Sequence, residues 1–417
     1  MIIYDNIHGY ITIDSIASSI IDTTIFQRLR FIHQTGIMYL VYPTANHSRF
    51  EHSIGTYHLA KTMIESIMKK QPELNITEEI VLLVSIAGLC HDLGHMMFSH
   101  LFDDCFLPKL PHYKDLCDNT TNIYHENRSI VLLYHMVEKY KIKLSKQQLK
   151  VIGDLINPKQ SEYSKWKPQY QIGKWIFQII SNPINSIDVD KFDYLTRDTN
   201  AVGLKMGFDY SRIINEARVY KQTICYSQEC NEDIYQMFFL RYRLHRQIYN
   251  NKTVKSIEIM ILKLLFEIEK THSISNYIMD PEKMIQLVDH MIWHIDKSVK
   301  CSDIIEQINM RQLPKLVYQD ISINPIEFDM SLLSNIDKED YNIIKFKVGY
   351  VGGKTNPLNN ITFYDLDTKE IISEQLSRNK VKDFSLLINQ KHQEHIIRIY
   401  CCNNDKLLLF TNIFNMK

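Results

Sequence analysis

The chain has 417 residues, of which 45% are hydrophobic and 23% charged, so it can bury a large core and is too long for one small domain. Its 48 Lys and Arg residues balance 48 Asp and Glu residues, which argues against nucleic acid or an anionic membrane as the main partner. Eight scattered cysteines without a CxxC pair indicate reduced thiols and a cytoplasmic or nuclear protein.

The first residues do not have the pattern of a signal peptide. Asp5 and His8 stand where such a peptide needs a basic and then an apolar run. The longest apolar stretch, residues 80–90, is about half the roughly 20 residues that a membrane span requires. We therefore expect neither secretion nor insertion into a membrane.

Apolar residues recur at helical spacing through the first two thirds of the chain. The segments with this pattern are 14–35, 51–70, 77–91, 124–141, 145–156, 188–199 and 232–269. Thr77 is suited to cap the third of these helices, which runs directly into His91 and Asp92. The Pro-containing connections 103–123 and 157–171 are either loops over a functional site or surface excursions.

From about residue 341 the apolar spacing changes toward two, which indicates short strands. The candidate strands are 342–351, 360–366, 395–401 and 406–414. The sequence thus predicts a mainly α protein. We expect a helical bundle in residues 1–270, then a helical extension and a small α+β C-terminal lobe in residues 271–417.

A cluster of histidines and aspartates follows the helix predicted at 77–91. The segment HDLGHMMFSHLFDD contains His91, Asp92, His95, His100, Asp103 and Asp104. An HD dipeptide alone is weak support for a site, and ordinary histidines at a solvated helix end are the alternative. A core cannot hide so many ionisable groups unpaired, however. His91 and His95 would share one face if this segment were helical.

Imidazole and carboxylate groups suit a divalent transition metal such as Fe, Mn, Zn or Ni. The set that we expect to hold such a metal comes from three separate stretches of the chain: His52, His91, Asp92 and Asp190.

The segments around these residues resemble the family of HD-domain dNTP triphosphohydrolases, and within it the vertebrate-type enzymes that couple a sterile-alpha-motif domain to the HD domain. The resemblance rests on DNIHGYITID, IIDTTIFQRLRFIHQTG, HSRFEHSIGTYHLA, IAGLCHDLGHMMFSHLFDD, IDVDKFDYLTRDT, FDYSRII and RLHRQIY, and weakly on 311–315 and KTNP. It begins at residue 1 or 2, so we expect no sterile-alpha-motif domain. It implies that residues 1–270 form an HD phosphohydrolase domain that converts a dNTP and water to a deoxynucleoside and inorganic triphosphate.

The resemblance also implies a role for individual positions. The metal ligands are the same four residues. The positions around the reacting phosphate are His95, His100, Asp103 and His125. The phosphate-binding positions are Arg49, Lys191, Tyr194 and Arg241. Those near the nucleoside are Gln34, Tyr194, Asp198, His245 and Tyr249, with Thr35 where the family more often has an apolar residue.

These residue types suit hydrolysis of a triphosphate, which depends mainly on positioning and on neutralising charge. The metal would lower the pKa of a bound water for attack on the α-phosphorus, with Mg on the triphosphate as a second ion. We expect His100, oriented by Asp103, to protonate the 5′ oxygen, and we rank His125 second. Tyr249 matches the position that crowds the 2′ carbon, so deoxyribose should be preferred.

Regulation is where this chain departs from the family, which gathers subunits around paired activator nucleotides. At the guanine-nucleotide position Asp22, Gln27 and Arg30 match, whereas Met1 and Tyr4 replace a Lys and an Asn. At the dNTP activator position the matches are Arg212, Lys252, Arg311, Lys315 and Lys354, and the departures are Ser227, Glu229, Asp233 and Asn251. We expect a homo-oligomer, a dimer or tetramer, whose activity depends less on GTP.

Two other functions fit parts of the pattern. A related HD-domain phosphodiesterase or nuclease would need a basic track for a polynucleotide, which the balanced charge does not provide. A nucleotide-binding regulatory scaffold would be expected to have damaged ligands, and all four ligand positions are intact.

Overall fold

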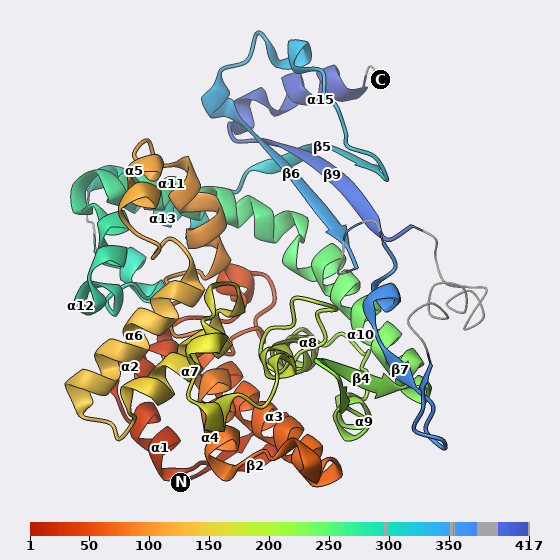
Figure 1. The fold of residues 1–417 in the computed structure, drawn as a ribbon. Helices are drawn as coiled ribbons and strands as arrows, with labels where there is room; N and C mark the ends of the chain where they lie inside the picture. The colour runs from red at the N-terminus through yellow and green to blue at the C-terminus, as the bar shows by residue number, and fades with distance from the viewer. Residues whose placement is uncertain (296–297, 351–352, 354, 373–390, 416–417) are drawn as a thin grey trace.

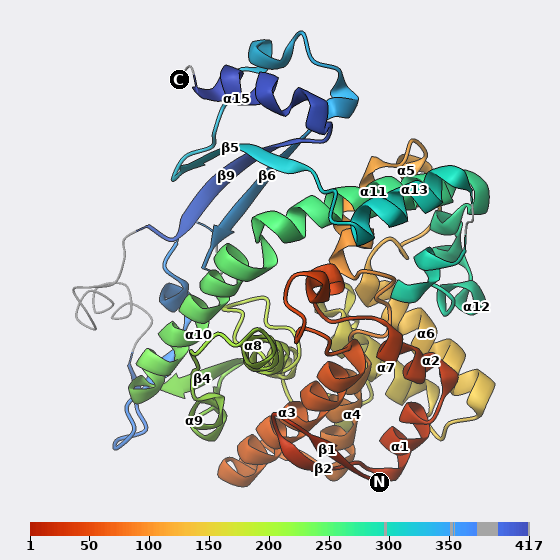
Figure 2. The same cartoon turned by 180° about the vertical axis from the view of Figure 1, so that it is seen from behind.

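The computed structural model describes residues 1–295, 298–350, 353, 355–372 and 391–415 (Figure 1). A helical body contains the N-terminus, and a smaller lobe with a three-stranded sheet lies at the C-terminal end, as the view from behind also shows (Figure 2). This is the mainly α architecture with a small α+β lobe that the sequence predicts. Among the described residues, no helix has both the length and the apolar character needed to cross a bilayer.

The helical segments agree with most of those predicted. The body contains α1 (Ser15–Ile21), α2 (Thr24–Gln27), α3 (Arg49–Lys70), α4 (Glu78–Cys90), α5 (Tyr113–Asn119), α6 (His125–Tyr140), α7 (Lys146–Ile156), α8 (Val189–Val202), α9 (Tyr210–Asn215), α10 (Asn231–Arg243), α11 (Lys252–His272), α12 (Pro281–Met284) and α13 (Val299–Asn309). The segment expected as one helix at 14–35 is instead α1, α2 and a short 3₁₀ turn, Arg28–Phe31.

Helices α3, α4 and α8 pack together and position the site. Ser48 and Glu51 form a capping box that starts α3, and the Thr77 hydroxyl accepts the Ile80 amide at the start of α4, as predicted. Gly88 lets the two helices approach closely, because a Cβ there would lie 2.9 Å from the Thr56 carbonyl oxygen. The end of α4 is therefore held beside the first turn of α3.

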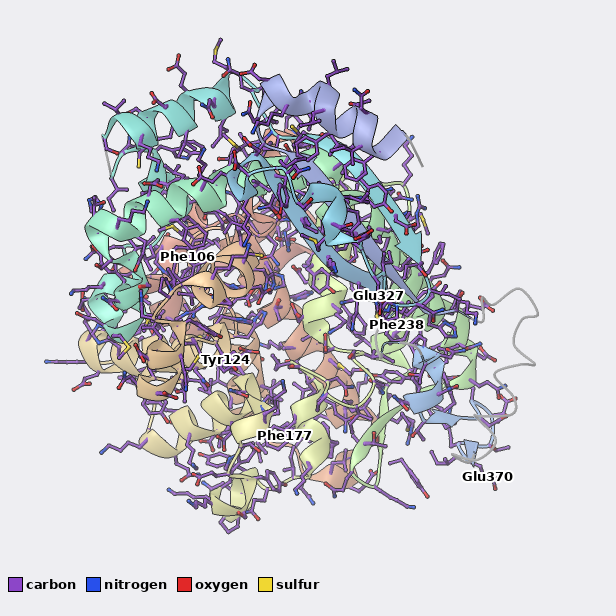
Figure 3. The ribbon with its side chains drawn as sticks, turned by 90° about the horizontal axis from the view of Figure 1, so that it is seen from above. Phe106, Tyr124, Phe177, Phe238, Glu327 and Glu370 are labelled. Atoms are coloured by element: carbon purple, nitrogen blue, oxygen red, sulfur yellow. The ribbon has the colours of Figure 1, made fainter. Side chains whose placement is uncertain are left out.

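The long helical run predicted at 232–269 is interrupted. A π-helical segment, Leu244–Tyr249, separates α10 from α11. Such wide turns often occur at functional sites because they redirect side chains. A second π-helical segment, Leu101–Phe106, follows the His/Asp cluster and ends at Phe106, which is labelled in Figure 3. Phe106 packs on Phe266 of α11 with ring centroids 5.3 Å apart.

The described part of the chain also contains three small sheets. They are the hairpin β1 (Ile2–Asp5) and β2 (Gly9–Thr12), a sheet of β3 (Arg218–Tyr220), β4 (Thr223–Ser227), β7 (Phe363–Tyr364) and β8 (Ile371–Ile372), and the antiparallel lobe sheet ordered β5 (Lys315–Ser322), β9 (Gln393–Cys401) and β6 (Tyr341–Gly349). The strands predicted at 342–351 and 395–401 correspond to β6 and β9, although residue 351 lies outside the described residues. The strand predicted at 360–366 is shortened to two residues, and β5 was not predicted.

One predicted strand is wrong. Residues 406–414 lie mainly in the helix α15 (Leu407–Asn415). Phe410 and Phe414 are four apart and meet the lobe sheet together: Phe414 lies 4.9 Å from the Tyr318 ring and Phe410 6.5 Å from the Tyr341 ring. The run of leucines conceals this helical spacing. All eight cysteines are free thiols, as expected.

Candidate active site

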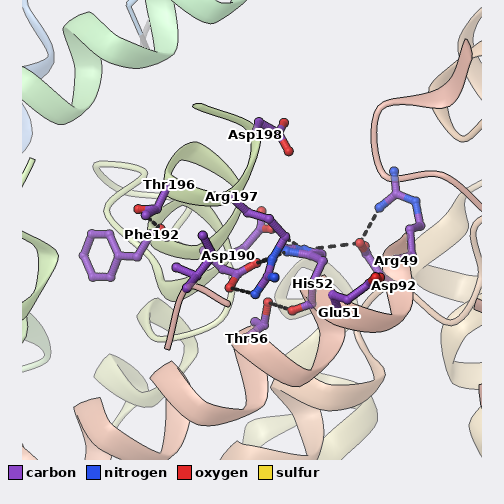
Figure 4. A network of polar contacts seen from close by, with 12 residues as sticks. Arg49, Glu51, His52, Thr56, Asp92, Asp190, Phe192, Thr196, Arg197 and Asp198 are labelled. Carbon is purple, nitrogen blue, oxygen red and sulfur yellow. Dashed lines mark hydrogen bonds and ion pairs between the residues drawn. The ribbon is translucent and has the colours of Figure 1, made fainter. Parts of the chain in front are cut away.

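Three predicted metal ligands converge from separate elements, with a fourth beside them. His52 lies in the first turn of α3, His91 directly after α4, and Asp190 in the first turn of α8. The His52 Nε2 atom is 3.1 Å from Asp190 Oδ1 (Figure 4). The same atom is 3.3 Å from His91 Nε2. An Asp92 carboxylate oxygen lies 3.4 Å from His52 Nε2 and the other 3.3 Å from His91 Nε2.

Both imidazoles are oriented through their other nitrogen. His52 Nδ1 donates to Asp193 Oδ2 at 2.8 Å, and His91 Nδ1 donates to the Gly88 carbonyl at 2.8 Å. These bonds aim both Nε2 atoms at the carboxylates, and a bound metal takes the place of any proton on Nε2. Burial alone would lower the pKa of His52, but Asp190 and Asp193 beside it raise that pKa to about 10. His52, His91 and Asp190 thus form a group that fits a divalent metal ion, and Asp92 lies beside both imidazoles.

A second group of side chains that could hold a metal ion lies next to the first. Asp92, His95 and His125 bring one ligand atom each within 4.8 Å of one another. His95 and His125 stack with ring centroids 4.0 Å apart, and His95 Nε2 is 3.4 Å from Asp92 Oδ1. Burial, and then the nearby Arg49 and His125 side chains, hold the pKa of His95 well below its usual value.

The segment from His91 to Ser99 is not helical. It consists of turns through residue 99, so His91 and His95 do not share a helix face and instead join different groups. Gly94 is needed where these turns cross α6, because a Cβ there would lie 2.0 Å from the His125 carbonyl oxygen. Ser129 of α6 secures the crossing by accepting the Gly94 amide at 2.8 Å and donating to the His91 carbonyl at 2.6 Å.

The expected pairing of His100 with Asp103 is wrong in this structure. Asp103 accepts two hydrogen bonds from the buried Arg128, at 2.6 and 2.7 Å, and lies 3.7 Å from His125 Nδ1. His100 instead faces Asp104 at 3.5 Å, and both side chains are about two-thirds exposed, at 65% and 69%. The π-helical segment after His100 changes which residues share a face.

Most of the predicted residues line one cavity of about 610 Å³. Those on its wall are Gln34, Thr35, Arg49, His91, Asp92, His95, His100, His125, Asp190, Lys191, Tyr194, Asp198, Arg241, His245 and Tyr249. His52 and Asp103 are not on the wall. His52, which belongs to the expected metal site, is fully buried. Asp103 contacts His125 from the side away from the cavity wall.

Three cations reach the same cavity. Arg49 is buried, pairs with Asp92 and donates to the Ser99 hydroxyl at 2.8 Å. Lys191 lies 3.0 Å from Asp188, and Arg241 donates to the Gly349 carbonyl at 3.2 Å. The Arg241 Nε atom has no hydrogen-bond partner among the described residues. These groups can neutralise and position a polyphosphate.

At the nucleoside end of the predicted site, Tyr249 donates to Asp198 Oδ2 at 2.6 Å, and its ring meets His245 edge to face at 4.9 Å. Burial, and then Arg241, lower the pKa of His245 to about 3, so this imidazole is neutral near pH 7. Gln34 Oε1 and Thr35 Oγ1 are buried without a partner in the described part of the chain. Buried polar atoms normally have partners, so their position beside the cavity is consistent with a ligand that supplies them.

Sequence reasoning missed several residues of the site. Asp193 orients His52, Arg128 holds Asp103, and His47 Nε2 lies 2.6 Å from Asp198 Oδ1. Asp193 could have been found, because it follows the ligand Asp190 by three residues in a predicted helix and so lies on the same side of it. Arg128 and His47 lie outside any local pattern with their partners.

The residues predicted for a guanine nucleotide also meet at one cavity. Asp22, Gln27 and Arg30 line a space of about 270 Å³ together with Met1 and Tyr4, the two departures from the family. Arg30 Nε donates a hydrogen bond to Gln27 Oε1 at 2.8 Å.

The residues predicted for a dNTP activator are distributed over α9, α11, β5 and the segment before β5. Arg212 lies 3.2 Å from Glu229 and 3.4 Å from Asp233, and Arg311 donates to the Leu40 carbonyl at 2.8 Å. Lys252 begins α11 and Lys315 begins β5. Lys354 lies outside the described residues.

The helical fold and its His/Asp group define an HD-domain protein, and residues 49–198 match the sequence model of the HD domain. The chain is 34% identical to the deoxynucleoside triphosphate triphosphohydrolase SAMHD1 homolog of Dictyostelium discoideum, over 97% of this chain and 78% of that protein. It is 32% identical to deoxynucleoside triphosphate triphosphohydrolase SAMHD1 of Homo sapiens, over 98% and 71%. It is 33% identical to the putative HD domain-containing protein L394 of Acanthamoeba polyphaga mimivirus, over 95% and 91%. The chain belongs to the family of SAMHD1 deoxynucleoside triphosphate triphosphohydrolases.

Proposed function

We propose that this protein is a metal-dependent dNTP triphosphohydrolase that converts a dNTP and water to a deoxynucleoside and inorganic triphosphate. The observation that carries the proposal is the single cavity that joins the metal group, three cations and the unpaired polar atoms near Tyr249. Its volume of about 610 Å³ lies in the range of pockets for small molecules and suits one nucleotide. Membership of the family agrees with this activity.

We propose that His52, His91, Asp92 and Asp190 hold one divalent transition metal, Fe, Mn, Zn or Ni, with Mg on the triphosphate as a second ion. When bound, such a metal supplies Lewis acidity that activates water and polarises the phosphate. The protein residues contribute the rest: Arg49, Lys191 and Arg241 hold the charged phosphates, and Tyr194 lines the same cavity. Their positive charge is fixed before the substrate arrives, so little reorganisation is needed during the reaction.

The leaving 5′ oxygen needs a proton. We propose His125 as the donor, because Asp103 lies 3.7 Å from its Nδ1 atom and can stabilise the protonated ring. Asp103 is itself fixed by Arg128, which prevents the carboxylate from turning away. His95 stacks on His125 and keeps the ring plane facing the cavity. His100 lies at the exposed rim of the same cavity and is the second candidate.

The nucleoside is proposed to lie against Gln34, Thr35, Asp198, His245 and Tyr249, with the sugar next to the Tyr249 ring. A ring at that position leaves no room for a 2′ hydroxyl, so ribonucleotides should be poor substrates. A phosphodiesterase or nuclease that acts on a chain of nucleotides would need a basic track, which the balanced charge of the chain does not provide.

Incubating the purified protein with each dNTP in oxygen-18-labelled water tests the proposal. Attack on the α-phosphorus gives inorganic triphosphate that contains the label, together with unlabelled deoxynucleoside. Stepwise appearance of orthophosphate or pyrophosphate would refute the reaction, and products from oligonucleotides or cyclic nucleotides would support the phosphodiesterase alternative. Nucleotide binding without turnover in the metal-loaded protein would support a regulatory scaffold.

Further proposals concern assembly, location and domain limits. We propose a homo-oligomer, a dimer or tetramer, with GTP bound near Asp22, Gln27 and Arg30 and a dNTP activator bound near Arg212, Lys252, Arg311 and Lys315. We also propose a cytoplasmic or nuclear location and no requirement for nucleic acid. The HD phosphohydrolase domain would comprise residues 1–270, and residues 271–417 the helical extension and lobe.

A further inference from the structure

A buried polar chain leads from the metal group to the N-terminal hairpin. His52 donates through Nδ1 to Asp193, which follows Asp190 by one turn of α8. Asp193 is bound in turn by Arg197 and by His8, and Arg197 reaches Asp5. All five side chains are at most 3% exposed, so each depends on the others to satisfy its polar atoms.

Asp193 accepts hydrogen bonds from three sides. Arg197 donates to both of its oxygens at 2.9 Å, and His8 Nε2 lies 2.7 Å from Oδ1. The Arg197 side chain also donates to Asp5 Oδ2 at 2.9 Å. With this many contacts the Asp193 carboxylate has one position, and that position fixes the ring of His52.

Gly55 shows how closely the carboxylate presses on α3. A Cβ at Gly55 would lie 1.9 Å from Asp193 Oδ1 and 2.6 Å from an Arg197 nitrogen. Glycine in the middle of a helix costs roughly 0.5–1 kcal/mol relative to alanine. Here it makes room for the Asp193–Arg197 pair one helical turn after His52.

The hairpin completes this arrangement from the other side. Asp5 Oδ1 accepts the amides of Ile7 and His8 at 2.8 and 2.9 Å, which forms the tight turn that aims His8 at Asp193. His8 Nδ1 is held by the Tyr210 hydroxyl at 3.1 Å. The same hairpin provides Met1, Ile3, Tyr4 and Asp5 to the wall of the 270 Å³ cavity.

We infer that Asp193 is the positioning residue for the metal ligand His52, and that the tip of the β1–β2 hairpin, through Asp5 and His8, is a structural part of the metal site. Any ligand that orders the hairpin in the 270 Å³ cavity therefore acts on the metal site through Asp5 and Arg197. By reciprocity, metal binding must stabilise the hairpin. The inference rests on the metal site of the proposed function and not on the identity of the substrate.

The affinity of the protein for a metal tests directly whether Asp193 positions His52. The protein is freed of metal with a chelator and titrated with Mn²⁺, and Asp193→Asn is expected to weaken binding by about 10- to 100-fold, as for other partners of metal-bound histidines. The visible spectrum of the Co²⁺-loaded variant should also shift, since the His52 ring is no longer held in one orientation. Glu79→Gln is the matched control, because it removes a part-buried carboxylate bonded to Gln148 and Tyr170 at the opposite end of α4.

Two further variants keep the test decisive if Asp193→Asn does not fold. His8→Gln removes one contact to Asp193, and Gly55→Ala displaces the carboxylate without removing a polar group. Both variants should weaken Mn²⁺ binding at least several-fold.

Hydrogen exchange provides the reciprocal readout: Mn²⁺ should slow exchange in residues 2–12 of the wild type and not in Asp5→Asn. Folded variants with wild-type Mn²⁺ affinity and an unprotected wild-type hairpin would overturn the inference. Loss of affinity in a protein that hydrolyses no dNTP would leave it standing while refuting the proposed function.

Discussion

Tyr249 donates its hydroxyl proton to Asp198 at 2.6 Å, and His47 faces the other oxygen of the same carboxylate at 2.6 Å. The Tyr249 ring is thus fixed from its polar end while its face remains on the cavity wall. A ring held in this way is a rigid steric limit, which discriminates better than a mobile side chain could.

Two substitutions of Tyr249 distinguish the contribution of its ring to sugar selectivity from that of its hydroxyl. Tyr249→Ala should raise the rate on ATP relative to dATP by about 10-fold or more, in the range known for steric discrimination of one small group. Tyr249→Phe keeps the ring and should retain most of the preference for dATP. The ratio of kcat/KM for the two nucleotides is the measurement. Equal turnover of ATP and dATP by the wild type would show that the proposed sugar position is wrong.

Thr35 has a buried hydroxyl without a partner in the described structure. An unpaired buried hydroxyl costs about 1–3 kcal/mol, so Thr35→Val should leave Tm unchanged or raise it. If the substrate supplies the missing partner, kcat/KM for dATP should fall by roughly 5- to 10-fold, the equivalent of one neutral hydrogen bond. Higher stability together with undiminished kcat/KM would show that this hydroxyl does not meet the substrate.

The proton donor can be assigned by comparing neighbouring carboxylates. Asp103→Asn removes the charge behind His125 and should lower kcat by about 100-fold, the lower end for general acid catalysis. Asp104→Asn changes only the exposed partner of His100 and should leave kcat nearly unaltered. Because Asp103→Asn also leaves Arg128 buried without its carboxylate, Tm must be measured alongside. The opposite pattern, a strong effect at Asp104 and a weak one at Asp103, would assign the role to His100.

Replacing a metal ligand should remove both the metal and the activity. His91→Ala and Asp190→Ala should each reduce the metal content found by elemental analysis and abolish turnover, with a circular dichroism spectrum like that of the wild type. Removing metal from the wild type should also lower Tm, because a ligand at 100 times its Kd stabilises the folded state by about 2.7 kcal/mol. Full metal content with full turnover in either variant would exclude that residue as a ligand.

The parts of the fold that could be predicted have strong local periodicity. Helices α3, α4, α6, α7 and α8 have apolar residues at regular intervals, and all but α6 begin with a side-chain cap. The ligands at the ends of α3, α4 and α8 come together because α3 packs on both of the other helices. The hairpin β1–β2 was missed because its strands have four residues each, too few to establish an alternation. The partner of Asp103 was misassigned because a π-helical turn changes residue spacing in a way that no sequence pattern reveals. Pairs such as His8 with Asp193 depend wholly on tertiary packing.

Activation by nucleotides should be weaker here than the family resemblance implies. Arg212 is already paired with Glu229 and Asp233, at 3.2 and 3.4 Å, so a polyphosphate must displace two carboxylates and approach their negative charge. The pair is partly exposed and each bridge is worth at most about 1 kcal/mol, which means that binding is reduced and not abolished. In the 270 Å³ cavity the side chains of Met1 and Tyr4 offer no positive charge to a triphosphate, although Arg30 remains. We therefore predict an oligomer with substantial dATP hydrolysis in the absence of GTP, measured by product formation and by sedimentation with and without GTP. The double variant Glu229→Gln/Asp233→Asn should bind an activating dNTP several-fold more tightly. A monomer that shows no turnover until GTP is added would contradict this prediction and show that other groups compensate for the lost cations.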